Sequence, residues 1–107
     1  MLDGKSFSLK SINGETITGN YLISFGDGTL NTKFCNTING SYTIDEKGKM
    51  NGTLLSTLMA CLDGESSKLE SKFNIDGADI KVEGDKFTLT TKNNDIFLWL
   101  TVLEDNL

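Results

Sequence analysis

The sequence YLISFGDGTLNTKF, residues 21–34, predicts a β-hairpin. Apolar and polar residues alternate from Tyr21 to Phe25 and again from Leu30 to Phe34, which is the period of a strand with one buried face. Gly26-Asp27-Gly28 lies between the two runs, and glycine adopts the backbone angles that a tight turn requires. We therefore expect two antiparallel strands joined by a short turn.

The same alternation recurs on both sides of this hairpin. Phe7 and Leu9 precede Asn13-Gly14, a dipeptide that favours the type I′ turn of a hairpin. Asn39-Gly40 is predicted to be a second turn of this kind, and Asn51-Gly52 is also interpreted as a turn. Further strands are expected within residues 41–44, 50–55, 80–82, 87–89 and 96–102, with turns at 45–48, 84–85 and 93–94.

The segment after Thr57 changes to helical spacing. Asp63 is predicted to cap a helix and Gly77 to end it. The helix would carry apolar residues on one side and lysines on the other, namely Leu62, Leu69 and Phe73 against Lys68 and Lys72.

The order of these elements predicts the fold class. No repeat or linker interrupts the chain, and its 107 residues fit one small core. We expect a single α+β domain over residues 1–107, in which a strongly twisted antiparallel sheet of about eight strands, partly barrel-like, wraps one helix.

The charged residues exclude several functions. The chain has ten lysines and fifteen acidic residues, a formal net charge of −5, and neither arginine nor histidine. An acidic surface without arginine makes nucleic acid an unfavourable partner. Histidine-dependent nucleophilic catalysis and ordinary catalytic zinc sites are excluded as well. No apolar run approaches the roughly 20 residues of a membrane helix. We expect no cofactor, no transmembrane segment and a monomer.

The carboxylates do not predict an active site. Asp76 with Asp79, or Glu83 with Asp85, could meet across a turn, but such pairs are inevitable in a small domain with fifteen acids. Asp27 and Asp45 lack the spacing of a calcium loop. We therefore predict no catalytic residue and no metal ligand.

Phe97 and Trp99 make the last strand hydrophobic on both faces. One interpretation is a central strand covered on both sides, with one face against the helix and the other inside the curled sheet. The other is that Phe97 or Trp99 belongs to an exposed patch that binds a partner. The first is preferred, and the second is kept as a candidate interaction surface.

Cys35 and Cys61 lie 26 positions apart and have three possible roles. A disulfide would constrain the unfolded chain by about 3 to 4 kcal/mol in the loop-entropy model. In a reducing compartment the same residues would be buried thiols. A nucleophilic thiolate has the least support, because the chain has no histidine to activate it. The spacing does not choose among these roles.

Two stretches of the chain resemble the META-domain family, also called the HslJ-like family. Residues 34–42, FCNTINGSY, contain a Cys-Asn followed by Gly-x-Tyr, and residues 54–61, LLSTLMAC, end in Thr-x-Met-x-Cys. Leu58 departs from the pattern, since arginine is common at this place in relatives. The signature residues are Cys35, Asn36, Gly40, Tyr42, Thr57, Met59 and Cys61.

The resemblance implies a twisted antiparallel sheet around one helix and a non-enzymatic function. Many bacterial relatives carry paired cysteines at the positions of Cys35 and Cys61 that could bridge. Family members are often envelope lipoproteins linked to stress and antibiotic resistance, or virulence-associated proteins of trypanosomatids. The resemblance therefore favours the cell envelope, the periplasm or secretion if a leader has been removed. A native start at Met1 would favour the cytoplasm.

Three functions remain open from the sequence. The first is a stress-related or envelope-associated domain that binds another protein through its surface. The second is a protease inhibitor that presents a rigid turn, at Gly26-Asp27-Gly28 or at residues 92–95. The third is a binder of a small apolar ligand inside the curled sheet, although side chains are expected to fill the interior of so short a chain.

Overall fold

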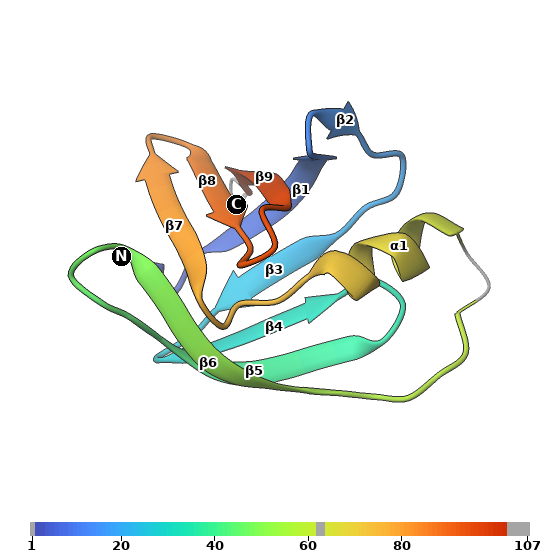
Figure 1. The fold of residues 1–107 in the computed structure, drawn as a ribbon, viewed down its shortest axis with the longest axis horizontal. Helices are drawn as coiled ribbons and strands as arrows, with labels where there is room; N and C mark the ends of the chain where they lie inside the picture. Colours follow the sequence, from blue (N-terminus) through green and yellow to red (C-terminus); the bar gives the residue numbers. More distant parts are fainter. Residues whose placement is uncertain (1, 62–63, 103–107) are drawn as a thin grey trace, which may run out of the picture.

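The computed structural model describes residues 2–61 and 64–102, and in them the chain forms nine antiparallel strands and one helix (Figure 1). Their bounds are β1 Ser6–Ile12, β2 Glu15–Thr16, β3 Leu22–Phe25, β4 Thr29–Lys33, β5 Thr37–Ile44, β6 Lys49–Ser56, α1 Gly64–Lys72, β7 Ala78–Glu83, β8 Lys86–Thr90 and β9 Ile96–Thr101.

The sheet closes into a barrel. The strand order is β2-β1-β3-β4-β5-β6-β7-β8-β9, and β1 also pairs with β9, so that all strands except the two-residue β2 form a closed antiparallel ring. The seam between β6 and β7 is the thinnest, because only Lys49 and Met50 pair across it, with Asp79 and Ala78. The predicted sheet of about eight strands is therefore observed, and it is fully closed.

The predicted turns agree with the structure at most positions. Asn13 and Gly14 both have positive φ, 51° and 83°, as the type I′ turn requires. The turn between β3 and β4 lies at residues 26–28, and the turn at residues 45–48 ends in Gly48 with φ 84°.

The prediction of turns at Asn39-Gly40 and Asn51-Gly52 is wrong, because both dipeptides lie inside strands. Gly40 in β5 faces Leu54, and Gly52 in β6 faces Tyr42. A Cβ atom on Gly40 would collide with the carbonyl oxygen of Thr53 on the neighbouring strand. Glycine here permits a close approach of two strands rather than a change of direction.

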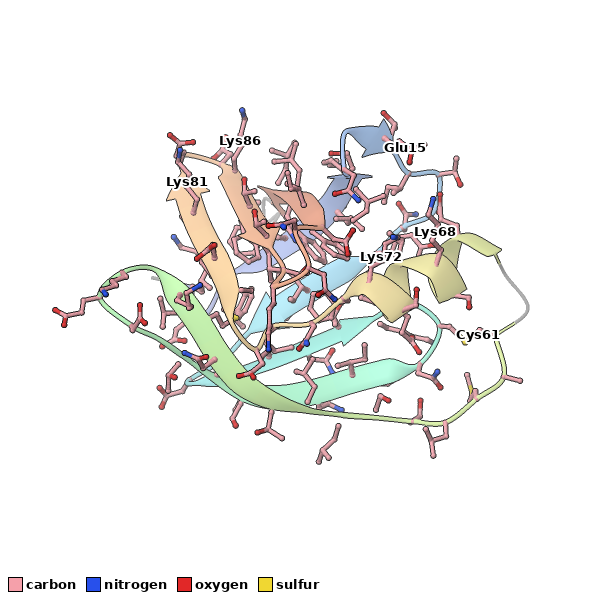
Figure 2. All side chains as sticks on the ribbon, in the orientation of Figure 1. Glu15, Cys61, Lys68, Lys72, Lys81 and Lys86 are labelled. Atoms are coloured by element: carbon pink, nitrogen blue, oxygen red, sulfur yellow. A yellow bond between two sulfur atoms is a disulfide. The ribbon has the colours of Figure 1, made fainter. Side chains whose placement is uncertain are left out.

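Helix α1 is short, and it packs on the core of the barrel through Leu69, with Phe73 just after it. Leu69 is buried, and the ring of Phe73, just after the helix, contacts Phe34 and Phe97 at centroid distances of 5.2 and 5.5 Å. The lysines make surface ion pairs to the barrel, Lys68 with Glu15 at 3.9 Å and Lys72 with Asp95 at 3.7 Å (Figure 2). The predicted cap Asp63 and Leu62 lie outside the described residues.

Aromatic side chains fill the barrel. Phe7 and Phe87 contact each other at 4.8 Å between ring centroids, and Phe87 stacks on Trp99 at 6.2 Å. The fold is α+β and barrel-like as predicted, but the helix is small and adds only Leu69 and the adjoining Phe73 to a core that the strands supply. The helix covers only one flank of this core.

The interaction surface predicted at Phe97 and Trp99 is wrong, because both side chains are 0% exposed inside the barrel. The expectation that both faces of this strand are covered is wrong too. Alternation along β9 places Ile96, which is 44% exposed, on the outer face together with the partly exposed Leu98 and Leu100.

Candidate functional site

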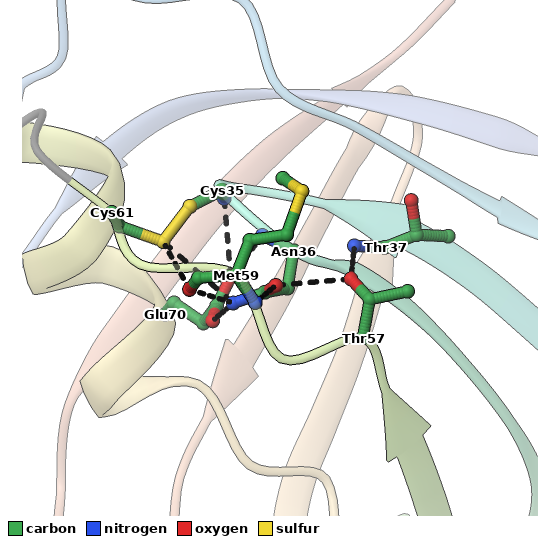
Figure 3. The surroundings of a disulfide bond; sticks show 7 residues. All are labelled: Cys35, Asn36, Thr37, Thr57, Met59, Cys61 and Glu70. Carbon is green, nitrogen blue, oxygen red and sulfur yellow. Dashed lines mark hydrogen bonds between the residues drawn. A yellow bond between two sulfur atoms is a disulfide. The ribbon is translucent and has the colours of Figure 1, made fainter.

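Cys35 and Cys61 form a disulfide, with their Cα atoms 5.9 Å apart (Figure 3). Cys35 lies in the turn between β4 and β5, and Cys61 ends the segment that leaves β6. The bond therefore attaches residues 57–61 to the start of β5.

Asn36 supplies a second attachment beside the disulfide. Its Oδ1 accepts hydrogen bonds from the backbone N–H of Met59 at 2.6 Å and from the hydroxyl of Thr57 at 3.0 Å. Its Nδ2 donates to Glu70 Oε2 at 2.7 Å and to the carbonyl oxygen of Met59 at 3.4 Å (Figure 3). One buried amide in the β4–β5 turn thus joins this turn to residues 57–61 and to helix α1. We call Cys35, Asn36, Thr57, Met59, Cys61 and Glu70 the polar joint.

Glu70 completes the joint from the helix. Its Oε1 accepts the backbone N–H groups of Cys35 at 3.1 Å and Asn36 at 2.7 Å. Burial raises the pKa of Glu70, but the hydrogen bonds from Asn36 and Cys35 outweigh burial and leave that pKa below its ordinary value. The carboxylate therefore holds the β4–β5 turn while it is ionised.

Glu65, on another side of α1, also binds backbone N–H groups of a loop through its carboxylate. It accepts the backbone N–H groups of Thr18 at 2.9 Å and Gly19 at 2.8 Å, and the hydroxyls of Thr18 and Tyr21. The backbone hydrogen bonds from Thr18 and Gly19 are the main reason that the pKa of Glu65 is lowered. Two carboxylates on one short helix thus anchor two separate loops.

Neither glutamate is marked as functional by the sequence. Glu65 and Glu70 are five residues apart, so they point in different directions from the helix. In an acidic chain they resemble the solvated face of any amphipathic helix. Their partners are backbone N–H groups, which the sequence does not mark.

The signature residues divide into two groups in space. Cys35, Asn36, Thr57, Met59 and Cys61 meet in the polar joint, whereas Gly40 and Tyr42 lie farther along β5. The Tyr42 hydroxyl donates to Asp3 Oδ1 at 2.5 Å, which ties the N-terminal segment to β5. Burial and this hydrogen bond raise the pKa of Tyr42.

A groove lies beside the polar joint, between β6 and α1. Its volume is about 510 Å³. Ile38, Leu54 and Phe73 form its apolar lining, and Ser56, Ser67 and Ser71 supply hydroxyls along it. The groove therefore combines an apolar floor with a polar rim, which is common in binding sites.

Three large apolar side chains at the end of β6 and in residues 57–61 are exposed. Leu55 is 74% exposed, Leu58 is 96% exposed and Met59 is 57% exposed. We call Leu55, Leu58 and Met59 the apolar strip. They follow one another along the end of β6 and the tethered segment, and Met59 also lines the groove.

The described parts of the chain, 2–61 and 64–102, contain no cluster of three or more His, Cys, Asp or Glu side chains placed to hold a metal ion. In the same residues, α1 is too short and too polar to cross a membrane.

Comparison with known proteins identifies the family. The META-domain model matches residues 1–102. The chain belongs to the META-domain family. The match includes residues 34–42 and 54–61, which contain every residue of the polar joint except Glu70.

Solved structures share the fold. A protein structure determined by NMR superposes with a TM-score of 0.80 at 24% sequence identity, covering 92% of this chain and 91% of that one. The NMR structure of a protein from Burkholderia xenovorans superposes with a TM-score of 0.69 at 20% identity, covering 96% and 85%. These likenesses concern the fold alone. Comparison with curated proteins finds no match.

Proposed function

We propose that this META domain is a non-enzymatic interaction domain of the cell envelope or the secretory route, and that it binds another protein through the apolar strip and the adjoining groove. The observation that carries the proposal is the exposure of Leu55, Leu58 and Met59, of which Met59 also lines an open groove. Burial of apolar surface contributes about 25 cal/mol per Å², so a partner that covers these side chains gains binding free energy.

The polar joint supports this role because it holds the segment that carries Leu58 and Met59, while Leu55 is held in β6. The disulfide holds this segment at Cys61, and Asn36 holds it at Thr57 and Met59. A surface that is already ordered loses little conformational entropy when it binds. The arrangement is therefore suited to presenting apolar side chains to a partner.

The disulfide supports an oxidising site of action. Such bonds persist in secreted and periplasmic proteins and are rare in the cytosol of mesophiles. Thiol alkylation of the protein from its native host, with and without prior reduction, tests this part of the proposal. Labelling of both cysteines only after reduction is expected, whereas labelling of the unfolded protein without reduction would contradict an oxidising compartment.

The binding function is tested by chemical crosslinking in the native host, followed by identification of the partner and measurement of its affinity with purified proteins. The variant Leu55→Ser/Leu58→Ser/Met59→Ser is expected to weaken binding at least tenfold, about 1.4 kcal/mol. The matched control Leu22→Ser/Ile96→Ser removes exposed apolar side chains elsewhere and should bind like the wild type.

Two results would overturn the proposal. One is a crosslinked partner whose affinity is equal for the wild type and the strip variant. The other is a catalytic turnover that survives repurification and depends on a named side chain of this chain.

A further inference from the structure

The two edges of β6 are unequally paired. On one side β6 pairs with β5 along its whole length, from Met50 opposite Ile44 to Ser56 opposite Ile38. On the other side its pairing with β7 stops after Met50. From Gly52 to Ser56, this second edge pairs with no other strand among the described residues, and Leu54 and Ser56 line the groove.

The backbone groups on this free edge can be assigned. The N–H of Thr57 donates to Thr37 and the N–H of Asp45 donates to Lys49, so the odd-numbered residues of β6 bond to β5. The backbone N–H and C=O groups of successive residues in a strand point to opposite edges of that strand. The even-numbered residues of β6 therefore direct their N–H and C=O groups away from β5 and toward the groove. Met50 agrees with this assignment, because its C=O accepts from Gly77 on that side.

Some of these groups lack a partner. The N–H of Gly52 donates to the Asp76 carboxylate at 3.4 Å. Within residues 2–61 and 64–102, the structure gives no partner on this edge for the N–H or C=O of Leu54 or for the N–H of Ser56. A strand edge with free donors and acceptors is a template for another extended chain.

The groove adjoins this edge directly. Leu54 and Ser56 line one wall, and Ser67, Ser71 and Phe73 line the wall formed by α1 and the residue that follows it. The side chain of Leu54 points inward, because Leu55 on the opposite face is exposed. An incoming strand would therefore place alternate side chains against Leu54 and Phe73 and direct the others to solvent.

We infer that the partner of the proposed interaction function binds as an extended strand, which pairs with Leu54 and Ser56 on the free edge of β6 and buries alternate apolar side chains in the groove. The inference rests on the proposed function and specifies its ligand. The chain has a net charge of −5, which favours a neutral or basic peptide over an acidic one.

The test uses synthetic peptides rather than the native partner. The probe is a blocked, fluorescent octapeptide of alternating valine and threonine with a lysine at each end. Its control has the same composition with the valines and the threonines grouped. We expect saturable binding of the alternating peptide, with an affinity at least about tenfold higher than that of the grouped peptide. One or two main-chain hydrogen bonds account for a difference of this size.

Two variants at one position test the hydrogen bonding. Ser56→Pro removes the outward N–H without removing a bond to β5, and proline is tolerated on a strand edge. Ser56→Val keeps that N–H. The proline variant is expected to bind the alternating peptide at least about tenfold more weakly than the valine variant. Thermal unfolding checks that both variants fold.

Hydrogen exchange of the wild-type protein gives a readout that needs no variant. The amide protons of Leu54 and Ser56 should gain protection when the alternating peptide binds. Absence of binding, or binding without protection and with equal affinity for the two Ser56 variants, would overturn strand addition. Neither result bears on the apolar strip, which the crosslinking experiment tests separately.

Discussion

The barrel interior and the polar joint are stabilised by different interactions. Inside the barrel, Phe7, Phe87 and Trp99 are buried from solvent, and the ring of Phe87 contacts the rings of both Phe7 and Trp99. At the joint, residues 57–61 are held by one disulfide and by the hydrogen bonds of Asn36.

This difference in interactions means that the barrel core stabilises the fold, whereas the polar joint holds part of the proposed binding surface in place. Apolar burial is distributed over many contacts and is the main favourable term in folding. The joint depends on a few specific groups at the periphery. We therefore expect that the joint can be loosened while the barrel stays folded, whereas damage to the core affects both regions.

The largest effect is expected from Phe87→Ala in the barrel. Phe87 is fully buried between Phe7 and Trp99, so its truncation should lower the free energy of unfolding by about 3–5 kcal/mol. Urea denaturation measures the change. Leu55→Ala, at an exposed position, is the control and should stay within about 0.5 kcal/mol of wild type. Equal effects would contradict the assignment of stability to the core.

The disulfide comes next. Cys35→Ser/Cys61→Ser should destabilise the protein by about 3–4 kcal/mol through greater entropy of the unfolded chain. The near-ultraviolet circular dichroism of Trp99 should stay native at low temperature, while amide exchange in residues 57–61 accelerates. Loss of the Trp99 signal would show that the joint and the barrel unfold together.

A smaller effect is expected at Asn36. Asn36→Ala leaves the N–H of Met59 and the carboxylate of Glu70 without their amide partner, at a cost of about 1–3 kcal/mol. Denaturant unfolding with the disulfide intact measures this cost. Asn51→Ala, at an exposed site on β6, is the matched control. If both substitutions cost the same, Asn36 has no special role in the joint.

The smallest effect is a pH dependence. The pKa values of Glu65 and Glu70 are lowered in the folded protein, so the unfolded chain binds protons first as the pH falls. The stability that the carboxylates contribute is complete above the ordinary value of 4.5 and is lost as the pH falls through the lower folded values. In Glu65→Gln/Glu70→Gln, the melting temperature should fall less between about pH 6 and pH 3 than in wild type. Glu46→Gln, in an exposed turn, should keep the wild-type dependence.

Turn chemistry shows how far local sequence predicts this fold. Asn13-Gly14 forms the predicted turn, whereas Asn39-Gly40 lies within β5. The dipeptide tolerates positive φ but does not require it. At Gly40 the missing Cβ serves the approach of β6, a contact with residues more than a dozen positions away.

The candidate site was predictable only in part. The resemblance brought Cys35, Asn36 and Cys61 to attention, and the structure places them together. Glu70 could not be found, because its partners are backbone N–H groups of a distant turn. The free edge of β6 was equally hidden, since it depends on where β7 stops pairing.

The local sequence predicts the strands, most turns and the helix around Leu69. The alternation of apolar and polar residues, the glycines in turns and the helical spacing of apolar residues are each visible within a few consecutive residues. Barrel closure by β1 and β9, the burial of Phe97 and Trp99, and the position of the polar joint depend on pairings between distant segments. Those pairings are selected by the packing of the whole core, and therefore they emerge only in the folded chain.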